Sequence, residues 1–232
     1  MGYIWIVASR YLRSKRRLSF ITLISLLASG GVFVGVAALT IVLSVMNGFE
    51  DQVQKRIAGT NAHAAVLNAD DRPLAPSDSL ERVILGAAPG AGIAPFVYGK
   101  VMVASRKSVD GMVMKGIDPA REARVTDVLD HLTPPRAPLD GGDLPGIGLG
   151  EELAVRLRVT VGDVILISLP SGEPEGIFGA PPRVKKLRVS SIFRSGLYEY
   201  DSSFGIVRME TAQEFFDLGG EVTGYELRLP DM

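Results

Sequence analysis

The chain has 232 residues with 25 basic and 26 acidic side chains, so its net charge is −1 at neutral pH. This balance argues against nucleic-acid binding, which depends on a basic face. The chain has no cysteine, which excludes disulfide bonds and thiolate chemistry, and about 185 residues follow the apolar N-terminal stretch, enough for one domain with a core.

The N-terminal residues 1–19 predict an amphipathic helix at the cytoplasmic membrane surface. Ile4 and Val7 fall near one side of such a helix, while Arg10 and Arg13 lean away from it. Cationic side chains on the polar face of an interfacial helix contact lipid headgroups. The alternative is a basic flank of the next segment with no structure of its own.

The stretch Phe20–Met46 contains no charged residue over 27 positions. At a rise of about 1.5 Å per residue a helix of this length reaches about 40 Å, more than the roughly 30 Å of a hydrocarbon core. The apolar region of a cleaved signal peptide has only about 7–15 residues. The stretch therefore predicts an uncleaved transmembrane helix.

The charges around this span predict its orientation. Five basic residues precede it, and the first acidic residue of the chain is Glu50. By the positive-inside rule the N-terminus lies in the cytoplasm, and residues 47–232 lie on the other side of the membrane. The basic residues are Arg10, Arg13, Lys15, Arg16 and Arg17.

Small residues recur within the span at spacings of three and four, at Ala28, Gly31, Gly35 and Ala38. This spacing places them on one helix face, where small side chains allow a partner helix to approach closely. The stripe therefore indicates assembly. Beyond the span, residues 47–60 keep a helical period and predict a stalk that continues the helix outward.

Residues 61–232 read as a mixed α+β domain of two lobes, because short helices alternate with hairpin-like strands. The stretch Pro134–Gly148 is rich in proline and glycine, which predicts a loop and a boundary between the lobes. The strands are expected at 63–69, 92–105, 109–117, 164–169, 184–193, 203–208 and 222–229, and the principal helices at 77–85, 150–157 and 211–218.

The sequence contains no recognisable catalytic or cofactor site. Gly99-Lys100 lacks the spacing of a phosphate-binding loop, and His63 and His131 have no partner at metal-ligand spacing. No Gly-x-Ser-x-Gly elbow is present. We therefore expect a non-enzymatic chain without a bound cofactor or metal.

Several segments in order resemble the LolC/LolE family of lipoprotein-releasing ABC-transporter permeases, within the MacB/FtsX-like permease superfamily. The similarity covers essentially the whole chain. It is carried by RYLRSKRR (10–17), LTIVLSVMNGFE (39–50), MKGIDP (114–119), LGEELAVRLRVTVGD (149–163) and VTGYELRL (222–229).

The resemblance implies a permease subunit of the bacterial inner membrane, with one span and a periplasmic domain followed by further spans. Two permease subunits, identical or related, pair with a cytoplasmic ABC ATPase dimer, which uses ATP and Mg²⁺. The complex extracts triacylated lipoproteins from the membrane and hands them to a periplasmic carrier. This chain resembles the N-terminal half of such a permease.

The resemblance also implies three functional regions. Residues 170–182 correspond to a hook that captures the carrier, although a plain hairpin tip is the alternative. A basic pad is expected beside the hook, but Leu166 and Val184 are apolar where polar pad residues are expected. The hook residues are Pro170, Ser171, Pro174, Ile177, Phe178, Pro181 and Pro182, and the pad residues are Arg183, Lys185 and Lys186.

The third region is a cavity for the lipoprotein's acyl chains, formed at the outer end of the span by Val42, Met46 and Phe49. A plain lipid-facing or packing role is the alternative. Two other functions compete with lipoprotein release: another MacB/FtsX-like permease, acting in efflux or in control of cell-wall hydrolases, and a single-span anchored binding or sensor protein.

Overall fold

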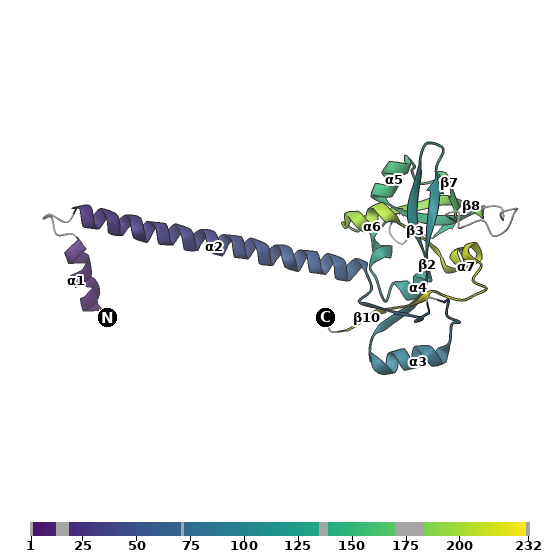
Figure 1. Cartoon of the computed structure of the whole chain (residues 1–232), viewed down its shortest axis with the longest axis horizontal. Coiled ribbons are helices and arrows are strands. Elements are labelled where there is room, and N and C mark those ends of the chain that lie inside the picture. The colour runs from purple at the N-terminus through teal and green to yellow at the C-terminus, as the bar shows by residue number, and fades with distance from the viewer. Residues whose placement is uncertain (1, 13–18, 71, 135–138, 170–182, 231–232) are drawn as a thin grey trace. The chain divides into compact units, whose positions relative to one another are not determined.

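The computed structural model describes residues 2–12, 19–70, 72–134, 139–169 and 183–230 (Figure 1). The chain divides into two compact units, residues 1–53 and 54–232. The first unit consists of α1 (Gly2–Leu12) and most of α2 (Ser19–Thr60).

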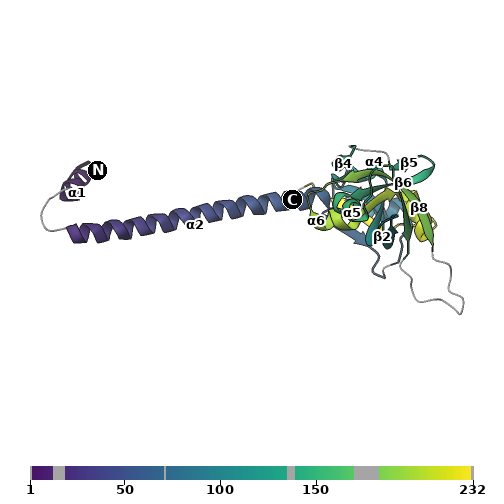
Figure 2. The ribbon, with the colours of Figure 1, turned by 90° about the horizontal axis from the view of Figure 1, so that it is seen from above.

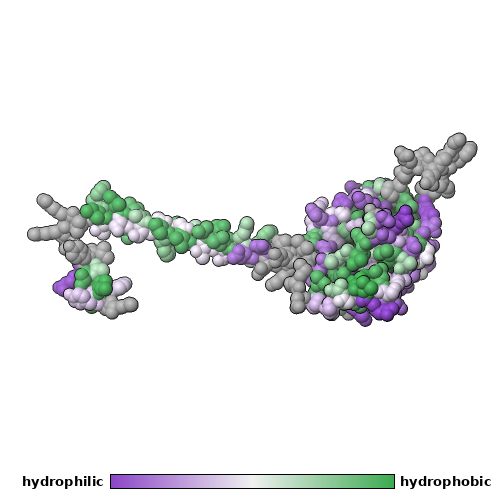
Figure 3. All heavy atoms as spheres, turned by 60° about the horizontal axis from the view of Figure 1, so that its bottom comes forward, coloured by the Kyte–Doolittle hydropathy of each residue, from purple (hydrophilic) through white to green (hydrophobic). Residues whose placement is uncertain are grey.

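The helix α2 continues without a break over 42 residues. From Phe20 to Glu50 it is long and apolar enough to cross a membrane, and every side chain in this stretch is exposed except that of Ala37, which is half-buried. Apolar side chains line this part of the helix (Figure 3). Two of its hydroxyl groups are satisfied within the helix, since Thr40 donates to the Val36 carbonyl at 2.9 Å and Ser44 to the Thr40 carbonyl at 2.8 Å. Such internal bonds suit a helix in hydrocarbon.

The second unit is an α+β domain built on a ten-stranded sheet, as predicted in class. The strands are β1 (Ala64–Leu67), β2 (Gly92–Ala104), β3 (Val109–Ile117), β4 (Leu132–Thr133), β5 (Asp140–Gly141), β6 (Leu144–Gly150), β7 (Val164–Ser168), β8 (Val184–Phe193), β9 (Phe204–Arg208) and β10 (Gly224–Arg228). The helices are α3 (Asp78–Ala87), α4 (Pro119–Glu122), the short 3-10 helix η1 (Val128–His131), α5 (Glu151–Leu157), α6 (Tyr198–Ser203) and α7 (Met209–Phe216).

The sheet closes on itself. The strands follow the order β1-β10-β2-β3-β9-β6-β8-β4, and β7 pairs with both β2 and β8. The strands β2, β3, β9, β6, β8 and β7 therefore form a ring in which each pairs with two neighbours. Alternate side chains of these strands, such as those of Val103, Ile165 and Ile167, are fully buried in the main apolar cluster. Figure 2 labels three strands of this ring, β2, β6 and β8, within the domain as seen from above.

The predicted loop and lobe boundary at 134–148 is wrong in its second half, because residues 144–150 form the strand β6 between β8 and β9. Ile147 is fully buried there. Gly142, with φ of 76°, lies in the turn between β5 and β6, whereas the glycines at 146 and 150 in β6 mark crowding. A Cβ at Gly146 would lie 2.6 Å from the Asp140 backbone nitrogen, and one at Gly150 would lie 2.1 Å from the Asp201 carbonyl oxygen.

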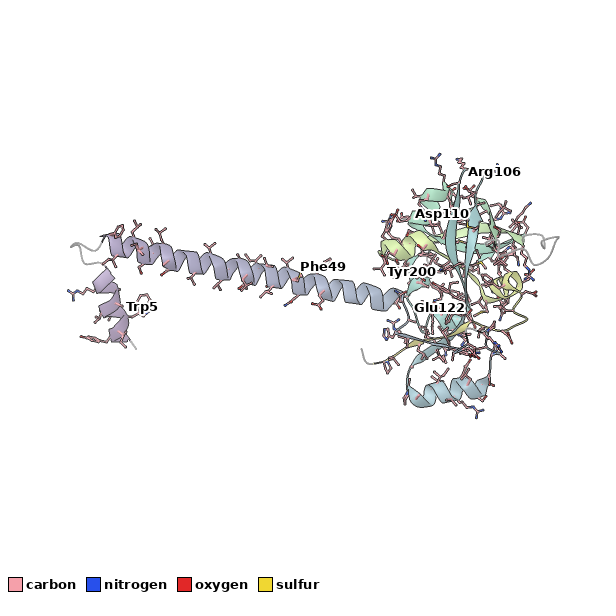
Figure 4. All side chains as sticks on the ribbon, viewed as in Figure 1. Trp5, Phe49, Arg106, Asp110, Glu122 and Tyr200 are labelled. Atoms are coloured by element: carbon pink, nitrogen blue, oxygen red, sulfur yellow. The ribbon has the colours of Figure 1, made fainter. Side chains whose placement is uncertain are left out.

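A lysine is buried on β3, between two carboxylates from separate elements. The Lys115 Nζ donates to Glu122 Oε1 of α4 at 2.9 Å and to Glu226 Oε2 of β10 at 2.7 Å, and Thr126 also donates to Glu122 Oε1 at 2.7 Å. Burial alone would lower the pKa of Lys115, but Glu122, Tyr200 and Glu226 outweigh it and raise that pKa above its ordinary value. Glu122 and Tyr200, which lines the same region, are labelled in Figure 4.

We predict that Lys115→Met lowers the free energy of unfolding by about 3–5 kcal/mol at pH 8, because it leaves the buried carboxylate of Glu122 and the half-buried carboxylate of Glu226 without a cation. Urea unfolding of the full chain in detergent, followed by near-ultraviolet circular dichroism of the domain's tyrosines, measures this. The pKa of Lys115 is higher in the folded than in the unfolded chain. Its contribution to the free energy of unfolding is therefore complete below the unfolded-state pKa of about 10.4, and it is lost as the pH rises through the folded-state pKa. The loss caused by the variant should therefore shrink above about pH 10.

Lys186→Met is the matched control, since Lys186 is exposed and forms no ion pair among the described residues. It should change stability by no more than about 0.5 kcal/mol. Equal effects of the two substitutions would show that the buried ion pairs do not stabilise the fold.

Candidate functional site

The residues expected to form an acyl-chain cavity, Val42, Met46 and Phe49, are all exposed on α2. Figure 4 labels Phe49 toward the end of the apolar stretch. Their spacings of four and three place them near one side of the helix. They present apolar surface, and the cavity itself stays a prediction because it would require helices from another subunit.

The small-residue stripe is equally open. Ala28 and Ala38 are exposed, and a Cβ added at Gly31 or Gly35 would meet no atom within 4 Å. Nothing in the described part of the chain packs on this face of α2. The backbone is thus accessible to a close-packed partner helix, which is what such stripes provide in membranes.

The seven hook residues, within 170–182, lie outside the described residues. Their attachment points are well defined, since β7 and β8 pair antiparallel with Ser168 opposite Val184. The segment therefore leaves and re-enters the ring between two hydrogen-bonded strands.

The three pad residues do not face one way. Arg183 donates to Asp217 Oδ2 at 2.7 Å, and Lys185 donates to Glu214 Oε2 of α7 at 2.5 Å. Lys186, by contrast, alternates to the opposite face of β8 and pairs in register with Leu166 of β7. Two of the three cations are therefore neutralised by neighbouring acids, and only Lys186 remains without an ion pair among the described side chains.

Lys186 belongs instead to an exposed, mostly apolar strip, which we call the β7 face. It consists of Met102, Val164, Leu166, Val184 and Lys186, all exposed on the outer side of β2, β7 and β8. The strand registers bring these residues together. On one side of β7, Leu166 lies opposite Ala104 of β2, two positions along the strand from Met102. On the other side, Leu166 lies opposite Lys186 of β8. The two apolar positions that departed from a polar pad, Leu166 and Val184, are the centre of this face.

Sequence reasoning missed the β7 face as a surface. The alternation of exposed Val164 and Leu166 with buried Ile165 and Ile167 could have predicted two apolar faces on one strand. The contribution of Met102 could not be foreseen, since it depends on β2 pairing with a strand more than 60 residues later in the sequence.

A family model for the MacB-like periplasmic core domain matches residues 25–231. The chain belongs to this family.

Curated relatives agree with the resemblance to LolC/LolE. This MacB-like chain is 33% identical over 227 residues to the lipoprotein-releasing system transmembrane protein LolC of Xylella fastidiosa strain Temecula1, covering 97% of this chain and 54% of that protein. It is 32% identical over 236 residues to LolC of Neisseria meningitidis, with the same coverage of both chains. It is 30% identical over 235 residues to LolE of Haemophilus influenzae, again covering 97% and 54%. The chain spans about half the length of the curated relatives it matches.

We predict that Gly35→Leu weakens the association of α2 with the transmembrane helix of a second subunit, because a large side chain keeps the two backbones apart. Resonance energy transfer between donor- and acceptor-labelled full chains in liposomes measures the association. Ala37→Leu makes a small-to-large change on roughly the opposite side of the helix and should leave the transfer unchanged. Equal losses in both variants would contradict packing through the stripe.

Proposed function

We propose that this chain is part of a permease subunit in an ATP-driven transporter that extracts lipoproteins from the bacterial inner membrane and hands them to a periplasmic carrier. The observation that carries the proposal is the 33% identity to LolC over nearly the whole chain. An exposed apolar helix long enough to cross a membrane, followed by a MacB-like periplasmic core domain, supports the same role.

In the proposed mechanism this chain acts mechanically and does not itself catalyse a reaction. ATP hydrolysis belongs to a separate cytoplasmic ATPase dimer, while this chain pairs with an identical or related permease subunit through the stripe on α2. The triacylated lipoprotein is held by apolar side chains such as Val42, Met46 and Phe49 at the outer end of the span. Methionine suits this task because its flexible side chain adapts to differently packed acyl chains.

The proposed orientation places the N-terminus in the cytoplasm and residues 47–232 in the periplasm. Because the chain lacks cysteine, single cysteines can test it. We predict that a membrane-impermeant maleimide labels Glu210→Cys in intact spheroplasts, and labels Ser9→Cys only after the membrane is permeabilised. Both positions are exposed, so access to the reagent should depend on the membrane alone. The reverse labelling pattern would exclude the proposed orientation.

Carrier docking is proposed to use the hook together with the adjoining β7 face. The hook leaves the ring at Ser168 and returns at Val184, so a partner bound to it would lie against Leu166 and Lys186. Exposed apolar side chains with a neighbouring cation are suited to an interface whose core is desolvated.

We predict that a photo-crosslinking amino acid at Phe178, or at Leu166, captures the purified periplasmic lipoprotein carrier in the intact permease. The Leu166 crosslink should weaken when residues 170–182 are deleted, because the hook then no longer holds the carrier in place. A probe at Arg208 serves as the control, since this exposed residue lies on β9, which does not pair with β7 or β8. Equal capture from all three positions would indicate nonspecific contact.

The same experiment separates the competing functions. An efflux permease or a regulator of cell-wall hydrolases shares the MacB-like domain but has no reason to capture a lipoprotein carrier. Absence of capture from both Phe178 and Leu166, with circular dichroism showing a folded domain, would favour these alternatives. Our choice among them rests on the similarity to LolC.

A further inference from the structure

A pocket of about 380 Å³ lies at the tip of the β2–β3 hairpin. Two segments of the domain supply its cations: Arg106 and Lys107 from the hairpin turn, and Arg158 from the position just after α5. Figure 4 labels Arg106 at the tip of the hairpin, beyond Asp110. The remaining lining residues are Ser105, Val159, Gly162, Asp163 and Val164.

The two segments are joined by a hydrogen-bonded serine. The Ser105 hydroxyl donates to the Leu157 carbonyl at 2.7 Å and accepts from the backbone N–H groups of Lys107 at 3.1 Å and Ser108 at 3.0 Å. Arg158 follows Leu157 in the left-handed conformation, with φ of 55°. The turn that carries Arg106 and Lys107 is therefore tied to the end of α5 beside Arg158, and the three cations are held near one another.

These cations are not neutralised by the domain's own acids. None of them forms an ion pair within the described residues, whereas other arginines do, as Arg156 does with Asp110 at 2.7 Å. The acid in the pocket, Asp163, is already engaged, since its Oδ2 accepts from the Thr160 backbone N–H at 2.7 Å and from the Thr160 hydroxyl at 3.1 Å. These bonds, aided by Lys107 and Arg106, lower the pKa of Asp163. Three positive charges against one negative charge leave the pocket cationic.

We propose that this pocket binds a compact phosphate group, either free or as part of a lipid headgroup. Guanidinium groups bind phosphate oxygens through paired N–H donors, and an ammonium adds a point charge. The nearby Arg156 is paired with Asp110, so the unpaired charge is concentrated in one hollow and does not extend as a stripe. A compact multivalent anion fits such a hollow better than an extended acidic peptide does.

This site is separate from the proposed transport surfaces. Its cations lie on the hairpin turn and after α5, whereas the β7 face lies on β2, β7 and β8 and the hook lies between β7 and β8. The pocket and the β7 face share only Val164, which lines the pocket and also belongs to the β7 face. The inference does not depend on the transported substrate, and its test contains no carrier or lipoprotein.

The test uses the full chain in a maltoside detergent, which contains no phosphate. Native mass spectrometry and calorimetry would measure binding of inorganic phosphate, of phosphatidylglycerol and of an acidic peptide. The variant is Arg106→Gln combined with Arg158→Gln, and Arg208→Gln is the control, because Arg208 is an exposed arginine without an ion pair among the described residues. All of these substitutions are at exposed positions, which favours retention of the fold.

The proposal expects saturable binding of inorganic phosphate or phosphatidylglycerol that weakens at least about tenfold in the double variant and is unchanged in the control, a loss that corresponds to one or two charge-assisted hydrogen bonds. Binding of both ligands identifies a general phosphate site, while binding of phosphatidylglycerol alone assigns it to a lipid headgroup. Absence of binding, equal binding by the double variant, or tighter binding of the acidic peptide than of either phosphate ligand would overturn the proposal.

Discussion

The apolar surface of α2 is the constraint on which the rest of this chain depends. Between Phe20 and Glu50 its side chains are exposed, apart from that of Ala37, which is half-buried. Leaving this much apolar area in water is unfavourable by about 25 cal/mol per Å², so the helix requires either lipid or other helices around it. A continuous helix also satisfies its own backbone groups, and internal bonds do the same for the hydroxyls of Thr40 and Ser44.

The domain contains a sheet of parallel and antiparallel strands, and the strand edges of such a sheet have to be paired. Closing β2, β3, β9, β6, β8 and β7 into a ring pairs both sides of each of these strands and encloses the main apolar cluster. The buried Lys115 then joins β3 to α4 and to β10, the strand that pairs with β1 directly after α2. A single cation thus connects the strands near the domain's entry to the wall of the ring.

Sequence reasoning was reliable where one physical signal dominated. The uncharged run from Phe20 to Met46 predicted the long helix, and β7 and β8 lie where strands were predicted, at 164–169 and 184–193. It failed at β6, because Gly146 was taken as part of a loop although it permits close backbone approach. It also grouped Lys185 and Lys186 in one basic pad, although the two side chains lie on opposite faces of β8. Lys185 pairs with Glu214, and Lys186 lies beside Leu166. Which acid lies near which cation depends on long-range pairing that no local pattern contains.

The strand β7 both closes the ring and exposes apolar side chains on its outer face. Its five residues close the ring between β2 and β8, and their inward side chains, Ile165 and Ile167, are fully buried. Its outward side chains, Val164 and Leu166, remain exposed beside the attachment points of residues 170–182. A segment placed between these two strands is therefore held at both ends by the ladders that β7 and β8 form with β2 and β6, which is the support that the proposed carrier docking would require.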